Sequence, residues 1–222
     1  MRGIKIHNCE FDYSYNASTR IDCKGILLGQ SQGAEIHDVT MDGCAIVLSA
    51  NEGWHKGIKV YNADIDASEL AVNKFWNNCA ASLEARNLIE ECEVYNSKFT
   101  TWTSYPLSPG KAGGEFGCKI HNNIIHNAKP TTSDLSIELC GNNDFEIFNN
   151  YMTNNNVGLS IGWMNAGNIF FHNNVLFGSP DDKLHSIGVR ISPHGGVLHD
   201  ITVANNVIDG MKSGIKAGDS GA

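Results

Sequence analysis

Short segments in which every second residue is apolar recur along this chain. Eight of them share the order apolar, any residue, apolar, any residue, Asn or Asp: Ile4–Asn8, Ala34–Asp38, Ile58–Asn62, Cys92–Asn96, Cys118–Asn122, Phe145–Asn149, Ile169–Asn173 and Ile201–Asn205. The Asn or Asp positions lie 30, 24, 34, 26, 27, 24 and 32 residues apart, about 28 on average. Alternation with a period of two is typical of β-strands. The repeat therefore predicts eight similar structural units.

Each unit contains more than one strand. Another apolar position follows each Asn or Asp, so the Asn marks a corner between two strands, and Asn tolerates the left-handed backbone that such a corner requires. A third segment follows in most units, often with the order Gly, apolar, any, apolar, as in Gly25–Leu28, Gly158–Ile161 and Gly188–Ile191; in the third unit the candidate is Leu70–Val72. Three short strands per repeat predict one rung of a parallel β-solenoid.

These segments resemble those of the right-handed parallel β-helix superfamily, the pectate-lyase-like proteins, over nearly the whole chain. The resemblance implies an all-β solenoid of about eight rungs in a single domain, 1–222, that is a segment of a longer solenoid. It also implies that the corner residues stack as an asparagine ladder: Asn8, Asp38, Asn62, Asn96, Asn122, Asn149, Asn173 and Asn205. Asp38 should weaken that ladder locally, because a carboxylate cannot donate a hydrogen bond.

Three stretches interrupt the repeat, and the last, residues 178–184, is a polar protrusion before the third strand of the seventh rung. Residues 77–88 contain good helix formers behind an Asn, which predicts a small helical insertion. Residues 100–117 contain Pro-x-x-Pro and Gly-Gly and predict a long exposed loop in the fourth rung, which leaves that rung without an assigned third strand.

Stacked rungs convert repeated positions into columns on the surface, because equivalent residues lie about 4.8 Å apart. The first outward column of the first strands alternates in charge: Lys5, Glu35, Lys59, Glu93, Lys119 and Glu146. The next outward column consists of rings: His7, His37, Tyr61, Tyr95, His121, Phe148 and His172. We interpret both as structural, an ion-pair ladder and a stacked ring ladder, rather than as a charged binding face or a metal site.

The outward column of the third strands is the candidate site. It is apolar or small in the early rungs and polar in the later ones: Leu27, Val47 and Ala71, then Glu138, Ser160, Arg190 and Lys216. In the family that the chain resembles, polysaccharide lyases and hydrolases bind their substrate over this face, so the resemblance implies a groove here. The hypothesis is a carbohydrate-active protein, a polysaccharide lyase or glycoside hydrolase that binds an acidic glycan.

Several side chains could carry that chemistry. Arg190 and Lys216 are suited to neutralise a uronate carboxylate or, for Lys216 above all, to remove a proton, and Glu138 could act as an acid. A hydrolase needs two carboxylates, for which Glu138 with Asp181 or Asp182 is the candidate pair.

Further candidates lie near the same face. His194 is a possible general acid or base beside Arg190. Ser160 and four tryptophans, Trp54, Trp76, Trp102 and Trp163, are candidate sugar contacts.

The motifs typical of catalysis in this family are missing, which keeps an alternative open. The chain could be a non-catalytic carbohydrate-binding or adhesin module, or the shaft of a phage tail spike. A chain of 222 residues with 41% hydrophobic and 18% charged residues is a folded protein in either case.

Net charge and cysteine spacing exclude some classes of binding partner and of metal site. A net charge of −8 without a basic cluster argues against nucleic acid or an anionic membrane as partner. Seven cysteines without CxxC spacing indicate no zinc site, and Cys92 and Cys118 are interpreted as packed thiols.

We expect no cofactor, with calcium at Asp12, Asp42 and Asp66 as the alternative. The first residues lack the apolar stretch of a signal peptide, and the expectation of an extracellular or cell-surface location rests on the resemblance alone. The uncapped ends of the solenoid predict either further rungs or a homo-oligomer.

Overall fold

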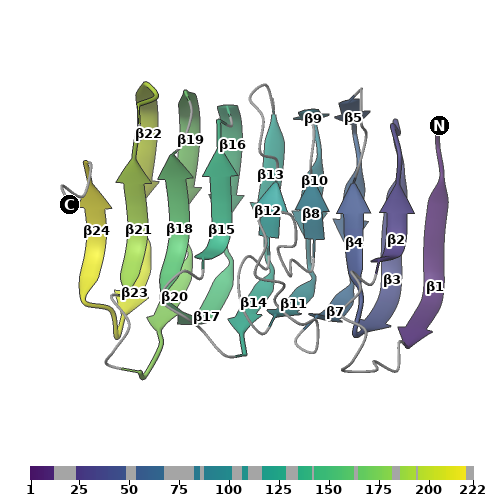
Figure 1. Cartoon of the computed structure of the whole chain (residues 1–222), viewed down its shortest axis with the longest axis horizontal. Helices are drawn as coiled ribbons and strands as arrows, with labels where there is room; N and C mark the ends of the chain where they lie inside the picture. Colours follow the sequence, from purple (N-terminus) through teal and green to yellow (C-terminus); the bar gives the residue numbers. More distant parts are fainter. Residues whose placement is uncertain are drawn as a thin grey trace.

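The computed structural model of the chain describes residues 1–12, 24–48, 54–67, 83–85, 88–101, 107–109, 117–128, 135–141, 143–162, 165–181, 186–193 and 195–218. These residues form a parallel β-helix, in which three columns of strands run side by side from the N-terminal to the C-terminal end (Figure 1). One turn of the helix, here called a rung, contributes one strand to each column. The predicted fold class of an all-β solenoid with about eight rungs is confirmed.

The first column begins each rung. Its strands are β1 (Lys5–Asp12), β3 (Glu35–Asp42), β6 (Lys59–Tyr61), β10 (Glu93–Tyr95), β13 (Cys118–His121), β16 (Asn143–Phe148), β19 (Ala166–His172) and β22 (Leu198–Ala204). A short sheet of β5 (Trp54–Lys56) and β9 (Leu88–Glu90) precedes this column in rungs 3 and 4.

The second column lies beyond the corner. It contains the second halves of β1 and β3, and then β7 (Asp64–Ala67), β11 (Lys98–Thr101), β14 (Ile124–Asn127), β17 (Tyr151–Asn155), β20 (Val175–Gly178) and β23 (Val207–Asp209).

The third column is a separate sheet of eight strands. They are β2 (Lys24–Leu28), β4 (Ala45–Leu48), β8 (Leu83–Ala85), β12 (Leu107–Pro109), β15 (Leu135–Cys140), β18 (Val157–Gly162), β21 (Ile187–Ser192) and β24 (Ser213–Ala217).

The core fills the space between the three columns. Many inward residues are fully buried, such as Ile36, Ile46 and Ile65 of rungs 2 and 3 and Phe171 near the other end, whereas the strands of the terminal rungs, β1 and β22, are only partly buried. Glycine opens several third strands because that position lies against the core. A Cβ on Gly158 would lie 2.3 Å from Leu176 Cδ2, so no other residue fits without displacing a core side chain.

The predicted corners are confirmed. All eight Asn or Asp residues of the repeat have a left-handed backbone, with φ between 51° and 56°. A second left-handed residue precedes each of them by five positions and was not predicted: Gly3, Gly33, Gly57, Glu91, Gly117, Asp144, Asn168 and Asp200. The first strand of every rung is therefore bounded at both ends by a backbone geometry that Gly, Asn and Asp adopt most readily.

The predicted position of the asparagine ladder is wrong by one residue. The corner residues are exposed, and Asn122, for example, donates from Nδ2 to Nδ1 of the adjacent His121 (3.1 Å). The inward residue after the corner forms the ladder: Ser97, Asn123, Asn150, Asn174 and Asn206. Asp38 does not interrupt the contacts between corner residues, because its carboxylate accepts hydrogen bonds from His37 and Asn62. These two bonds lower the pKa of the Asp38 carboxyl.

The helix predicted over residues 77–88 is wrong for the part that the structure describes, because β8 and the start of β9 are strands. Strand β8 pairs with β4 on one side and β12 on the other, and this pairing overrides the helix propensity of its residues. It takes the place in the third column that was predicted for Leu70–Val72, which lie outside the described residues. Likewise β12 lies within the segment predicted as a loop, 100–117, and supplies the missing third strand of rung 4.

Candidate functional site

The outward column of the third strands is continuous in register. Paired positions run from Leu27 through Val47 to Glu84 and Ser108, and then through Glu138, Ser160 and Arg190 to Lys216. The structure thus aligns four predicted site residues, Glu138, Ser160, Arg190 and Lys216, in consecutive rungs. Glu84 occupies the position predicted for Ala71, and the helix prediction for its segment concealed it.

The middle of this column is not an open groove. Leu27 is 55% exposed, whereas Glu138 is 6% and Ser160 2% exposed although both occupy outward positions. The Arg190 guanidinium donates from Nε (3.1 Å) and from an Nη atom (3.0 Å) to Ser160 Oγ. These two bonds fix the half-buried arginine side chain across the serine, so Ser160 Oγ already has a charged partner.

Arg190 and Lys216 form a cationic pair at the end of the column. Their strands β21 and β24 pair in register, which places the two residues about 4.8 Å apart along the solenoid axis. Lys216 is exposed, and neither side chain forms an ion pair with a carboxylate among the described residues. On a chain of net charge −8, this is a local positive potential facing solvent.

The other predicted site residues do not join this group in the described part of the chain. Trp76, Trp102, Trp163, Asp182 and His194 lie outside it. Trp54 belongs to β5, in the short sheet beside the first column rather than in the third column. Asp181 is exposed, and its backbone amide donates to Ser179 Oγ (3.3 Å). The pairing of Glu138 with Asp181 or Asp182 therefore stays a prediction.

The charged column of the first strands forms the predicted ion pairs. Glu93 forms an ion pair with Lys59 in the rung before (3.7 Å) and a hydrogen bond with Nε2 of His121 in the rung after (2.9 Å). Glu146 lies in the same way between Lys119 (3.1 Å) and His172 (3.3 Å). Although burial raises it, these two contacts lower the pKa of Glu146 overall.

Glu35 repeats the pattern, with Lys5 before it and the Tyr61 hydroxyl after it. The glutamates thus connect three successive rungs, which fits the structural interpretation of this column.

The ring column is a single stack of seven rings. Neighbouring centroids lie 4.6 to 5.3 Å apart, with interplanar angles of 10° or less, from His7 to His172. The rings face each other rather than solvent, so they stabilise the register of the rungs and offer no ring face to a ligand.

The acidic column of the second strands was the candidate for calcium. Asp12, Asp42 and Asp66 occupy paired positions one rung apart. Within the described ranges, no group of three or more His, Cys, Asp or Glu side chains could hold a metal ion. Calcium binding at this column stays a prediction.

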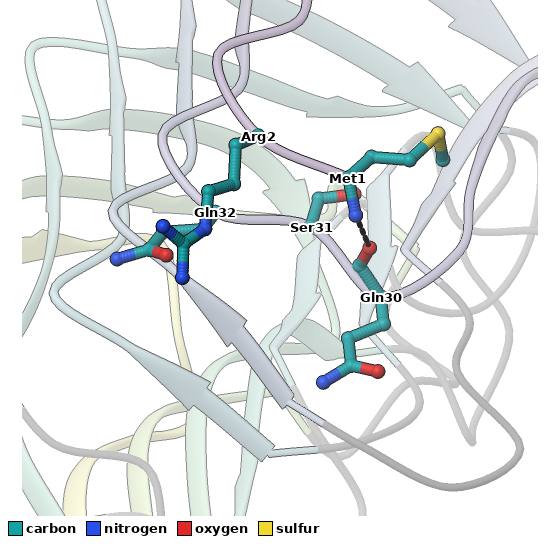
Figure 2. A pocket seen from close by; sticks show the side chains of 5 residues that line it. All are labelled: Met1, Arg2, Gln30, Ser31 and Gln32. Carbon is teal, nitrogen blue, oxygen red and sulfur yellow. Dashed lines mark hydrogen bonds between the residues drawn. The ribbon is translucent and has the colours of Figure 1, made fainter.

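A shallow pocket lies at the other end of the solenoid from Arg190. It has a volume of about 130 Å³ and is lined by Met1, Arg2, Gln30, Ser31 and Gln32 (Figure 2). The terminal amine of Met1 donates to the Gln30 carbonyl oxygen (2.9 Å) at its edge. None of the predicted site residues lines it.

The described part of the chain contains no helix that is long and apolar enough to cross a membrane.

Comparison with known proteins supports the fold alone. No protein-family model matches the chain. No curated protein matches it either. Among solved structures it is similar to PfbA, a surface adhesin of Streptococcus pneumoniae, with a TM-score of 0.58 and 11% sequence identity. The similarity covers 97% of this chain and 62% of the adhesin chain, so this chain spans less than two thirds of that structure. Identity at this level shows a shared β-helix and not a shared ligand.

Proposed function

We propose that the chain is a non-catalytic surface-recognition module that binds an acidic glycan at the end of its third-strand column. The observation that carries this proposal is the pair Arg190 and Lys216, two cations in register without a carboxylate partner among the described residues. A guanidinium and an ammonium about one rung apart are suited to the repeated carboxylates of a uronate chain. The aligned strands present them on a rigid surface.

Binding is a better match than catalysis for the side chains of this column. An arginine keeps its proton in proteins, so Arg190 is suited to hold a carboxylate and not to abstract a proton. A glycosidase needs two carboxylates about 5 to 9.5 Å apart with access to the sugar. From β15 to β24 the column contributes Glu138 alone, and that side chain is 6% exposed.

The structural neighbour favours the same kind of role. PfbA is described as a surface adhesin, and its fold extends over almost all of this chain. We extend that role to this chain as part of the proposal, together with a location at the cell surface or outside the cell. A polysaccharide lyase or glycoside hydrolase remains the alternative function, and the experiment below is designed to detect its products as well.

The test compares binding of acidic and neutral oligosaccharides by calorimetry. We expect the wild-type chain to bind oligogalacturonate or oligoalginate and not a neutral oligoglucan, and to lose affinity as salt is added. Lys216→Ala and Arg190→Gln should each weaken binding at least about tenfold, which corresponds to roughly 1.4 kcal/mol. Lys119→Ala, a lysine on the first-strand face, is the matched control and should bind like the wild type.

Two results would contradict the proposal. Unchanged affinity in both Lys216→Ala and Arg190→Gln would remove these cations from the binding surface. The appearance of unsaturated uronate absorbance or of new reducing ends, lost in Glu138→Gln, would show that the chain is an enzyme.

A further inference from the structure

Two cysteines lie opposite each other in adjacent rungs. Cys92 directly precedes β10, and Cys118 is the first residue of β13. The two strands pair with Glu93 opposite Lys119, and the Lys119 amide donates to the Cys92 carbonyl oxygen (2.9 Å). Cys92 is thus the residue opposite Cys118 in the inward column, with Phe145 paired to Cys118 in the next rung.

Both thiols are reduced and point into the core. Cys92 is 7% exposed and Cys118 is 2% exposed. Each Sγ lies near a carbonyl oxygen of the preceding segment, Cys92 near Glu90 (3.4 Å) and Cys118 near Ile89 (3.9 Å). A hydrogen bond from the Cys118 thiol lowers the pKa of Cys92 although burial opposes it. The thiolate is the form that reacts with disulfides.

The spacing of the strands fits a covalent bond between these thiols. Paired strands lie about 4.7 to 4.9 Å apart, and disulfides form between Cα atoms about 4.4 to 6.8 Å apart. The side chains of in-register parallel strands point in the same direction, so the two Cβ atoms do not diverge. Closing the bond requires rotation of the side chains and approach of the two Cβ atoms by a few tenths of an ångström, to about 4.5 Å or less, and no change of register.

We propose that Cys92 and Cys118 are a disulfide site that joins rung 4 to rung 5 when the chain meets a small-molecule disulfide such as oxidised glutathione. The Cys92 thiolate attacks one sulfur of the oxidant, which forms a mixed disulfide and releases one small thiol. The Cys118 thiolate then attacks Cys92 Sγ in that mixed disulfide and releases the second. Two protein thiols are oxidised and one small disulfide is reduced to two thiols.

Cys9 does not share this arrangement. Cys9 lies opposite Val39 in the neighbouring rung, so no second sulfur is in register with it. Cys9 therefore serves as the internal control for non-specific oxidation.

The experiment maps the cysteines of the full chain in glutathione buffers of increasing oxidised fraction. After acid quenching and alkylation, the unreduced chain is digested and analysed by mass spectrometry. We expect a cross-linked peptide pair containing Cys92 and Cys118, with Cys9 recovered as an alkylated thiol. Recovery of Cys92 and Cys118 as separate alkylated or glutathionylated peptides throughout the series would overturn the proposal, as would their linkage to other cysteines.

A second measurement follows the effect on the fold. The wild-type thermal midpoint should rise by several degrees in oxidising buffer, because the bond restricts the unfolded chain. Cys118→Val, which keeps an apolar side chain in the core, should show no such rise. An equal response of wild type and variant would contradict the assignment. If the variant does not fold, the peptide map of the wild type decides.

Discussion

Replacing Asn150 by alanine tests the amide ladder that runs through the last rungs. The Asn150 side chain is 1% exposed. Its Oδ1 accepts from the backbone amide (3.1 Å) and from Nδ2 (3.0 Å) of Asn123, and its Nδ2 donates to Ile120 O (2.9 Å) and Asn174 Oδ1 (3.0 Å). Alanine removes these four contacts and a fifth, from Nδ2 to Phe148 O (3.1 Å), and leaves buried polar groups of two neighbouring rungs without these partners.

The expected cost follows from those groups. A hydrogen bond contributes roughly 0.5 to 1.5 kcal/mol net, and a buried group left unsatisfied costs roughly 1 to 3 kcal/mol. The Asn123 amides and the Ile120 carbonyl lose a partner together, so we expect Asn150→Ala to lower the free energy of unfolding by about 3 to 5 kcal/mol. Asn149 precedes it in the sequence but is exposed, with φ of 55°. Glycine adopts that backbone freely, so Asn149→Gly should change stability by less than about 0.5 kcal/mol.

Urea unfolding followed by circular dichroism measures both variants under the same conditions. Several rungs can unfold separately in a solenoid, so the midpoint of the transition is the quantity to compare. If Asn149→Gly destabilises the chain as much as Asn150→Ala, the ladder would not be where the hydrogen bonds place it, and the reasoning would be refuted.

Two further predictions concern the core. His55 is fully buried, its ring nitrogens have no hydrogen-bond partner among the described residues, and burial lowers its pKa from 6.5. As the pH falls, the unfolded chain therefore binds a proton at this histidine before the folded chain does. The contribution of His55 to the free energy of unfolding should be fully present above pH 6.5 and should be lost as the pH falls through the lowered pKa. His55→Leu should lose less stability than the wild type between pH 7.5 and 5 in urea titrations, and an equal loss would contradict this. Gly158→Ala should cost about 1 to 3 kcal/mol through contact with Leu176, whereas Gly214→Ala, with open space around it, should leave the thermal midpoint almost unchanged.

The outward columns of the first strands could be predicted from the sequence residue by residue, whereas the ladder could not. The repeat fixes which residues share a face, so the pairs of Lys119 with Glu146 and the ring stack followed from alternation alone. Each of the later corners contains two adjacent asparagines, such as Asn149 and Asn150. They differ in burial, which the sequence pattern alone does not show. The consecutive Asn pairs of the last four rungs were the signal that the second residue has its own role.

The third column was predicted least well for the same physical reason. Short strands such as Leu83–Ala85 and Leu107–Pro109 contain too few residues for alternation to show, and their pairing partners are 20 or more residues away in sequence. Their conformation is determined by the neighbouring rungs and not by local propensity. For this reason Glu84 was missed as a member of the candidate site.

Register is what connects the core to the proposed recognition surface. Val189 is fully buried and Ile191 packs against the core, so Arg190 between them must point outward, and its pairing with Lys216 follows from the pairing of these neighbours. A shift by one residue would place the arginine in the core, which makes its outward position as secure as the core itself. The outward residues themselves are not constrained in this way, and the same column changes from Leu27 to Glu138 to Arg190 along one solenoid. In this β-helix the core therefore sets the register, while the outward residues differ from rung to rung. The expectation of an acidic glycan rests on the charges of Arg190 and Lys216 more than on the fold shared with an adhesin.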